Sequence, residues 1–216
     1  MKTRTILVAL SSLIAGVVAC NAAGVMIVNI DAGVGDTLYA TSNNTLMSSG
    51  LVTMGYFPAT ITTADIDTLP ELLLNLNNYT TITSAVPGTV STLLGTANPG
   101  YVDQPGFNTS LGSVTAGNPL LGRMLYSIVT NGNTLTGNTE YALVAIGALK
   151  DDVPFANDYV SNPKGLLPII GTLGAFNGDA GGGDGSYGTL KMLAVPEAST
   201  ALLGALGALG LLRRRR

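Results

Sequence analysis

Hydrophobic and polar residues alternate in short runs through most of this chain, as they do in strands with one buried face. Runs rich in threonine, valine, isoleucine and tyrosine are separated by glycine, asparagine and proline at spacings of roughly eight to twelve residues. The pattern predicts strands at 25–31, 37–42, 51–57, 79–86, 123–130, 140–148 and 189–195. We therefore expect an all-β fold, a single sandwich or jelly-roll-like domain.

Two dipeptides and one strand refine this expectation. Asn43-Asn44 predicts a turn after the second strand, and Asn131-Gly132 can take the positive φ angles of a tight turn. In strand 123–130 one face carries Met124, Tyr126 and Ile128, and the other carries Arg123, Leu125, Ser127 and Val129. One face is plainly core and the other partly so.

One short helix is expected among the strands. Thr68-Leu69-Pro70-Glu71 has the sequence of a capping box with proline in the first turn, and Leu72, Leu73 and Leu76 follow at helical spacing. We expect this helix to pack on the sheet and to close one end of the domain. Residues 62–67 predict a short helical turn ahead of it.

The first 22 residues have the pattern of a secretory signal helix. Lys2 and Arg4 precede an uncharged stretch over 5–19, and Ala22 offers a small residue at the cut with Cys20 two positions before it. We predict cleavage after Ala22. Residues 17–20 also resemble a lipobox, which would instead make Cys20 a lipidated first residue.

A second apolar segment spans 198–212 and stops against the arginine cluster Arg213, Arg214, Arg215 and Arg216. About fifteen residues make roughly 22 Å of helix, short of the ~20 residues that span a hydrocarbon core. The arginines stay in water or among anionic headgroups, which orients them toward the cytoplasm. Gly204, Gly207 and Gly210 give this helix a small-residue face that can pack closely on another helix.

The whole segment resembles a known sorting signal. Its motif consists of Val195, Pro196, Glu197, Ala198, Ser199 and Thr200, followed by the apolar helix and the arginine cluster. This order is similar to the PEP-CTERM tail that exosortases process on exported bacterial proteins, a type of tail also labelled ice-binding protein C-terminal. The resemblance implies cleavage near Pro196 and Glu197. Ala198 stands where the family usually has proline, a departure that bears on processing efficiency.

The body also resembles the short secreted β-rich proteins that carry this tail. The similar stretches are 54–57, 64–69, Leu125-Tyr126 and 139–143. This resemblance implies architecture and location and adds no chemistry. The expected organisation is a signal peptide over 1–22, an all-β exported domain over 23–194 and a sorting tail over 195–216.

Removing both ends leaves a strongly acidic body. Residues 23–196 contain four basic residues, Arg123, Lys150, Lys164 and Lys191, against twelve acidic ones, a net charge of −8. Such a field repels phosphate backbones, so no nucleic acid partner is expected. The same residues include no histidine, tryptophan or cysteine. Histidine-based nucleophilic triads, thiolate or imidazole zinc sites and disulfides are therefore excluded from the body.

Carboxylates in turns are weak candidates for Ca²⁺ ligands. They comprise Asp31 and Asp36, Asp179 and Asp184, and the pair Asp151-Asp152. None has the register of an EF-hand, and turn chemistry is the simpler interpretation. A glycoside hydrolase would need two carboxylates, but Glu71 is assigned to the helix cap and Glu140 begins a strand. We expect no catalytic activity and no bound cofactor.

Two surface features bear on ligands. The tyrosines could bind carbohydrate weakly where they are exposed; they are Tyr39, Tyr56, Tyr79, Tyr101, Tyr126, Tyr141, Tyr159 and Tyr187. Three threonine pairs, at 60/62, 81/83 and 134/136, would each share a strand face. Their irregular spacing argues against an ice-binding array.

These observations predict an exported, non-enzymatic protein destined for the cell surface or extracellular matrix. Its expected partners are signal peptidase, an exosortase-like membrane enzyme and, through 198–212, the membrane. The alternative is a polysaccharide- or calcium-binding module of that matrix.

Overall fold

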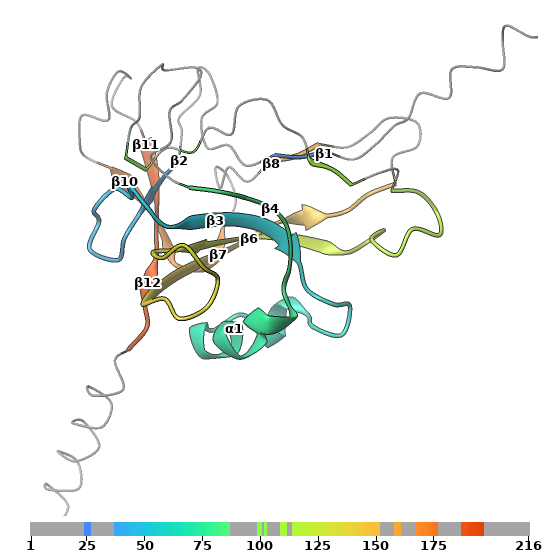
Figure 1. The fold of residues 1–216 in the computed structure, drawn as a ribbon, viewed down its shortest axis with the longest axis horizontal. Coiled ribbons are helices and arrows are strands. Elements are labelled where there is room, and N and C mark those ends of the chain that lie inside the picture. The colour runs from blue at the N-terminus through green and yellow to red at the C-terminus, as the bar shows by residue number, and fades with distance from the viewer. Residues whose placement is uncertain are drawn as a thin grey trace, which may run out of the picture.

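In the computed structural model the described residues are 24–26, 37–86, 99–100, 102, 109–111, 114–151, 158–160, 167–176 and 187–196. They form an all-β fold of three hydrogen-bonded sheets with one short α-helix (Figure 1). The expected signal helix and the apolar C-terminal helix lie outside the described residues. The all-β prediction is confirmed.

The largest sheet has six strands, and all their pairings are antiparallel. In order across it lie β12 (Leu193–Ala194), β7 (Glu140–Ala148), β6 (Met124–Thr130), β3 (Leu51–Tyr56) and β4 (Thr80–Ala85), with β9 (Pro168–Ile170) also paired to β7. The four longest of these strands, β3, β4, β6 and β7, match the predicted ranges to within one residue. Their alternating patterns are long enough to define a buried face.

Two three-stranded sheets accompany the large one. The first contains β10 (Thr172–Phe176), β11 (Tyr187–Lys191) and β2 (Thr37–Ala40), and the second contains β5 (Thr109–Ser110), β1 (Gly24–Met26) and β8 (Asp158–Val160). The β11–β2 and β1–β8 pairs are parallel. The sequence did not predict β5, β8, β9 or β10, because three are too short for a period-two pattern and Gly174 interrupts the fourth.

Two neighbouring segments connect the large sheet with a smaller one. β9 continues through Gly171 into β10, and β11 continues through Met192 into β12, so the predicted single strand over 189–195 is divided. Gly171 has φ +100°, and a Cβ there would stand 3.2 Å from the Cβ of Ala142. Glycine therefore allows the chain to turn closely against β7.

Both faces of the large sheet are buried. One core cluster combines residues of all three sheets, among them Val25, Tyr39, Leu125, Val129 and Leu190. On the opposite face of β6, Tyr126 and Ile128 belong to a second cluster that includes Leu72 of the helix. The alternation predicted for strand 123–130 is thus confirmed, and its less apolar face is buried by the smaller sheets.

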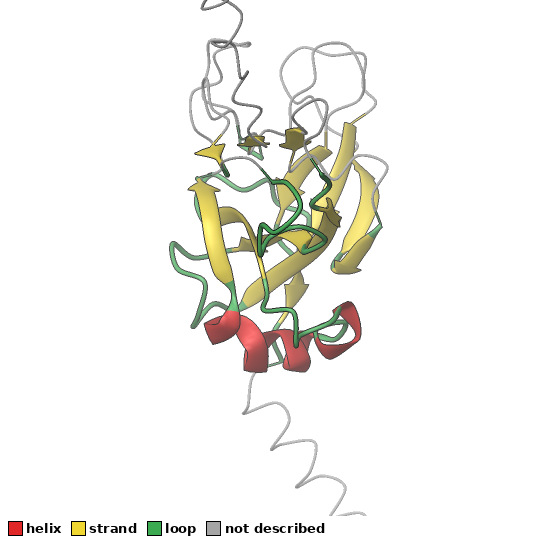
Figure 2. Cartoon of the chain, turned by 90° about the vertical axis from the view of Figure 1, so that its right-hand side faces the viewer, coloured by secondary structure: helices red, strands yellow, loops and turns green. Residues whose placement is uncertain are grey.

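The helix α1 (Leu69–Asn75) lies between the 3-10 turns η1 (Thr63–Asp65) and η2 (Leu76–Asn78). It begins with the expected capping box, in which the backbone N–H and the hydroxyl of Thr68 donate to Glu71 Oε2 at 3.3 and 2.7 Å. Figure 2 shows the helical segments gathered on one side of the strands. Leu72 and Leu76 pack in the second cluster, so α1 covers a face of the large sheet and does not close one end of the domain.

The two predicted turns have different outcomes. Asn44 has φ 65° and its N–H donates to the Thr41 carbonyl at 3.0 Å, which confirms the first turn. Asn131-Gly132 instead opens a longer loop to β7, in which Asn131 Nδ2 donates to Thr139 Oγ1 at 2.7 Å. The positive φ falls at Gly137. The tight-turn prediction is wrong, because a turn dipeptide does not by itself fix the length of a loop.

Candidate binding pocket

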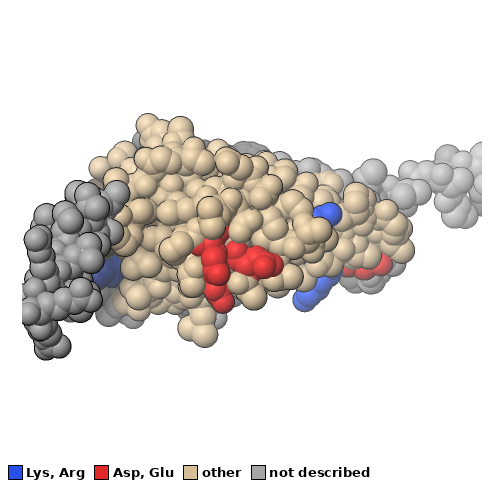
Figure 3. All heavy atoms as spheres, turned by 90° about the horizontal axis from the view of Figure 1, so that it is seen from below, with Lys and Arg blue, Asp and Glu red and all other residues tan. Residues whose placement is uncertain are grey.

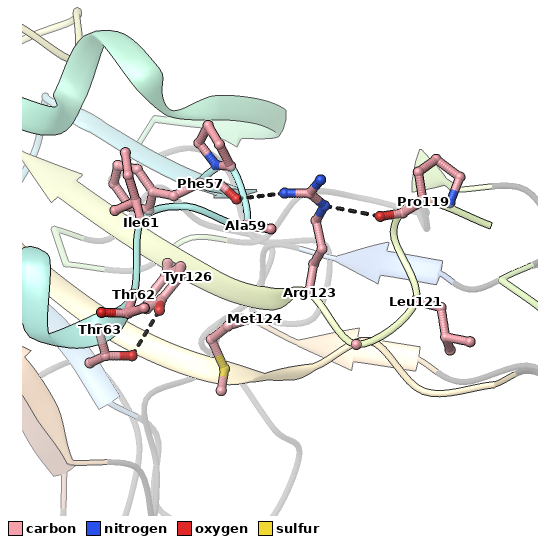
Figure 4. A pocket seen from close by; sticks show the side chains of 12 residues that line it. Phe57, Ala59, Ile61, Thr62, Thr63, Pro119, Leu121, Arg123, Met124 and Tyr126 are labelled. Carbon is pink, nitrogen blue, oxygen red and sulfur yellow. Dashed lines mark hydrogen bonds between the residues drawn. The ribbon is translucent and has the colours of Figure 1, made fainter. Parts of the chain in front are cut away.

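A pocket lies where the loop after β3 meets the loop before β6. Its volume is about 380 Å³, in the lower part of the ~300–1,000 Å³ range of small-molecule sites. The lining residues are 57–59, 61–63, 119, 121–124 and Tyr126. Figure 4 shows Arg123 on one side of this pocket and the Thr63–Tyr126 pair on another.

Arg123 is held in position by two backbone carbonyls. Its Nε donates to the Pro119 carbonyl at 3.0 Å and its Nη1 to the Phe57 carbonyl at 3.3 Å (Figure 4). The guanidinium carbon lies 5.6 Å from the centroid of the Tyr56 ring, within the range of a cation–π contact. No carboxylate of the described residues forms a salt bridge with Arg123.

Hydroxyl groups form the opposite side of the pocket. Thr63 Oγ1 and the Tyr126 hydroxyl are 2.9 Å apart and share one hydrogen bond. Beside them, the backbone N–H and the hydroxyl of Thr62 donate to Asp65 Oδ2 at 2.8 and 2.7 Å. These hydrogen bonds lower the pKa of Asp65 below its usual value, so this carboxylate remains charged near the pocket.

Local sequence explains how the two loops are held. The loop before β6 turns at Asn118, whose Oδ1 accepts from the Leu120 N–H at 2.8 Å, and at Gly122, which has φ +78°. Gly122 and Arg123 then pair with Leu149, through backbone hydrogen bonds of 2.8 Å each. On the other side, the Phe57 ring packs against the rings of Tyr79 and Tyr126, with centroids 5.0 and 5.6 Å apart.

The chemistry of the pocket suits binding. Of its described lining residues, only Arg123 and Tyr126 are ionisable, and the remaining groups are hydroxyls, backbone and apolar side chains. Arginine presents a planar fork of N–H donors that matches a carboxylate. The arrangement can therefore hold a ligand that carries one negative group and several hydroxyls.

A second cavity is apolar and lies beside the last described residues of the chain; we call it the exit groove. It is lined by residues of α1, β9 and β12 together with Val195 and Pro196, and its volume is about 620 Å³. Leu193, on its wall, is 48% exposed. Asp67 is the one ionisable side chain among its described lining residues, so the exit groove offers apolar contact and little chemistry.

Acidic side chains gather on the face that carries α1 (Figure 3). Hydrogen bonds from Thr68 and Asp67 lower the pKa of Glu71, whereas the contact with Glu71 raises the pKa of Asp67. Within the described ranges, no group of three or more acidic, histidine or cysteine side chains is placed to hold a metal ion. Glu71 belongs to the cap of α1, and Asp67 lies just before that cap.

Most of the predicted sorting residues lie outside the described part of the chain. These are Ala22, Cys20, Glu197, Ala198, Ser199, Thr200, Gly204, Gly207, Gly210, Arg213, Arg214, Arg215 and Arg216. Val195 and Pro196 are described: Val195 is half-buried and its N–H donates to the Thr139 carbonyl at 2.7 Å, and Pro196 is exposed. None of the described helices is both long and apolar enough to cross a membrane.

The carboxylates considered from sequence are only partly described. Asp31, Asp36, Asp152, Asp179 and Asp184 lie outside the described residues, and Asp151 is exposed. Glu140 accepts from the Ser42 hydroxyl at 2.6 Å and from the Ser42 N–H at 3.3 Å. Glu140 thus ties β7 to the turn after β2, and Glu71 caps α1 as predicted.

The aromatic and threonine candidates are also only partly described. Four of the tyrosines, Tyr39, Tyr79, Tyr126 and Tyr141, are buried, and Tyr56 is half-buried beside Arg123. Tyr101 and the side chains of Tyr159 and Tyr187 are not described. Of the threonine pairs, 60/62 leads into η1 and 134/136 lies in a loop, so two of the three do not stand on strands.

Sequence reasoning missed Arg123 as a site residue; it placed Arg123 only on one face of the predicted strand 123–130 and among the four basic residues of the body. A signal was present, because Arg123 is the only arginine between residues 23 and 196 and stands between a glycine and the first residue of β6. Its position against Phe57 requires a contact between residues 66 positions apart. That contact cannot be read from local spacing.

Comparison with protein families, with curated proteins and with solved structures finds no significant match to this chain.

Proposed function

We propose that this chain is an exported, non-enzymatic protein of the cell surface or extracellular matrix, sorted by the PEP-CTERM-like signal over 195–216. The three sheets would form a sandwich around the first core cluster. The signal helix would be removed by signal peptidase after Ala22, with lipidation of Cys20 as the alternative. The helix over 198–212 would then hold the protein in the membrane until an exosortase-like enzyme cleaves it.

The observation that supports this most directly is the junction between fold and motif. Ala194 still pairs with Glu140 in the large sheet, and the Val195 N–H still donates to Thr139. Pro196, the next residue, is exposed. A cut near Pro196 and Glu197 would therefore leave every described strand in place.

Variants of the motif test the sorting proposal in the native host. Glu197→Ala should leave the protein in the membrane fraction, while the wild type is found outside the cell in a shorter form. Ala198→Pro, which restores the residue usual in the family, is the matched control and should be processed at least as fast. Equal release of the wild type and Glu197→Ala would contradict the proposal.

A second candidate function is polysaccharide binding, and the Arg123 pocket favours it. The pocket combines a fixed guanidinium with a hydroxyl pair on an otherwise acidic body. Binding of oligosaccharides to the full chain in detergent, measured by calorimetry, tests this candidate. A protein that binds no sugar at millimolar concentration would rule it out.

A further inference from the structure

We propose that the Arg123 pocket recognises sugars that carry a carboxylate, so that its ligand is a polysaccharide in which single uronic acid units are spaced by neutral sugars. This inference rests on the second candidate function. It adds the charge of the ligand and the residues that bind the charged group.

Arg123 is prepared to bind an anion. The carbonyls of Pro119 and Phe57 accept from Nε and Nη1 and so fix the plane of the guanidinium before any ligand arrives. Its remaining N–H donors have no carboxylate partner among the described residues. A guanidinium fixed in this way loses little side-chain entropy when its remaining N–H groups donate to a carboxylate.

The hydroxyl pair supplies the second half of the site. Thr63 Oγ1 and the Tyr126 hydroxyl share one hydrogen bond, so one O–H and several lone pairs are left to meet the hydroxyls of a sugar. Ile61 and Met124 lie near them on the pocket wall (Figure 4). Their apolar surface suits the C–H face of a sugar ring.

The charges around the pocket favour a ligand that places one negative group at Arg123. Arg123 is the one cation among the described lining residues, and the Asp65 carboxylate lies at the edge, bonded to Thr62. With a net charge of −8 over residues 23–196, a densely charged polyanion would be repelled. A uronic acid places one carboxylate on a ring of hydroxyls and fits both halves of the site.

The test uses the full chain in detergent, with a trimer of one galacturonic acid and two galactose units as the acidic probe and the all-galactose trimer as its neutral match. Calorimetry should show binding of the acidic trimer at least tenfold tighter than binding of the neutral one. Arg123→Lys keeps the charge but loses the planar guanidinium that the two carbonyls hold, and should weaken binding of the acidic trimer at least fivefold. Thr63→Val should weaken binding of the acidic trimer without removing Arg123. Lys191→Gln removes an equal charge in β11 and should change nothing.

Each of the other outcomes would overturn one part of the proposal. Equal affinity for both trimers would reject carboxylate recognition and leave polysaccharide binding standing, whereas no binding of either trimer would reject both. Unchanged binding in folded Arg123→Lys and Thr63→Val would place the sugar elsewhere. Tighter binding of a peptide with a free C-terminal carboxylate than of the acidic trimer would contradict the proposal. It would show that the pocket binds the C-terminus of a protein. Melting temperatures of all variants separate loss of binding from loss of fold.

Discussion

The ring of Tyr79 lies over Gly55, so closely that a Cβ added to Gly55 would stand 2.8 Å from the Tyr79 Cζ. Gly55 is in β3 beside the register shift that interrupts its pairing with β4. The Tyr79 hydroxyl reaches across and donates to the Tyr126 carbonyl at 2.9 Å. The glycine therefore admits an aromatic side chain that joins β3 to β6 and packs against Phe57, a residue that lines the Arg123 pocket.

Gly55→Ala should destabilise the protein, because its Cβ would meet the Tyr79 ring and the Thr80 carbonyl. We expect a loss of about 1–3 kcal/mol in the free energy of unfolding, as for other overpacked sites. Gly174→Ala is the matched control in a strand, since a Cβ there has no neighbour within 4 Å. Urea unfolding of both variants measures the difference. Similar stability of the two would contradict the described packing.

Alkaline pH should destabilise the protein through Tyr79. Burial raises the pKa of Tyr79 above its ordinary value of 10.0. The folded state therefore holds the Tyr79 proton more tightly than the unfolded state does. The contribution of Tyr79 to the free energy of unfolding is complete below its ordinary pKa and is lost as pH rises above that value. Tyr79→Phe should lower stability at pH 7 by about 1–2 kcal/mol through loss of a buried hydrogen bond.

The same variant should also flatten the alkaline decline. Melting curves between neutral pH and pH 11 compare the two proteins. An equally steep loss of stability in Tyr79→Phe would show that another group is responsible.

Acid should weaken the start of α1. Hydrogen bonds from Thr68 hold the pKa of Glu71 below its usual 4.5, so this contribution is present above pH 4.5 and is lost as pH falls through the lower, folded value. Asp67 acts in the opposite direction, because its pKa is raised by Glu71. Thr68→Ala should lower the melting temperature by a few degrees at pH 7 and reduce its fall in acid.

Thr136→Ala, at an exposed loop position, is the control for the cap and should leave the whole pH profile unchanged. If Thr68→Ala and Thr136→Ala gave the same profile, the cap would not be the source of the acid sensitivity.

Two truncations locate the boundary of the folded domain. A stop codon in place of Glu197 keeps β12 and the Val195 hydrogen bond, so its melting temperature should equal that of the full chain. A stop codon in place of Met192 removes β12 and the buried Met192 side chain, and should lower the melting temperature by several degrees. Circular dichroism on both proteins makes the comparison. Destabilisation by the first truncation would mean that the sorting tail is part of the fold.

The sequence was most informative where a pattern is local. The four long strands and the capping box of α1 follow from alternation and from side chains a few residues apart, and the structure confirms them. The pairings of β1 with β8 and of β2 with β11 could not be predicted, because each joins segments more than a hundred residues apart. The Arg123 pocket was missed for the same reason, since its two loops meet only in the fold.

The most direct test of the account is the intact mass of the protein from its native host, measured separately in membrane and extracellular fractions. We predict an extracellular species that begins after Ala22 and ends near Pro196, with the helix over 198–212 and Arg213 to Arg216 removed. A species that retains Arg213 to Arg216 in every fraction would contradict processing of the tail. A cytoplasmic species that still begins at Met1 would contradict export itself.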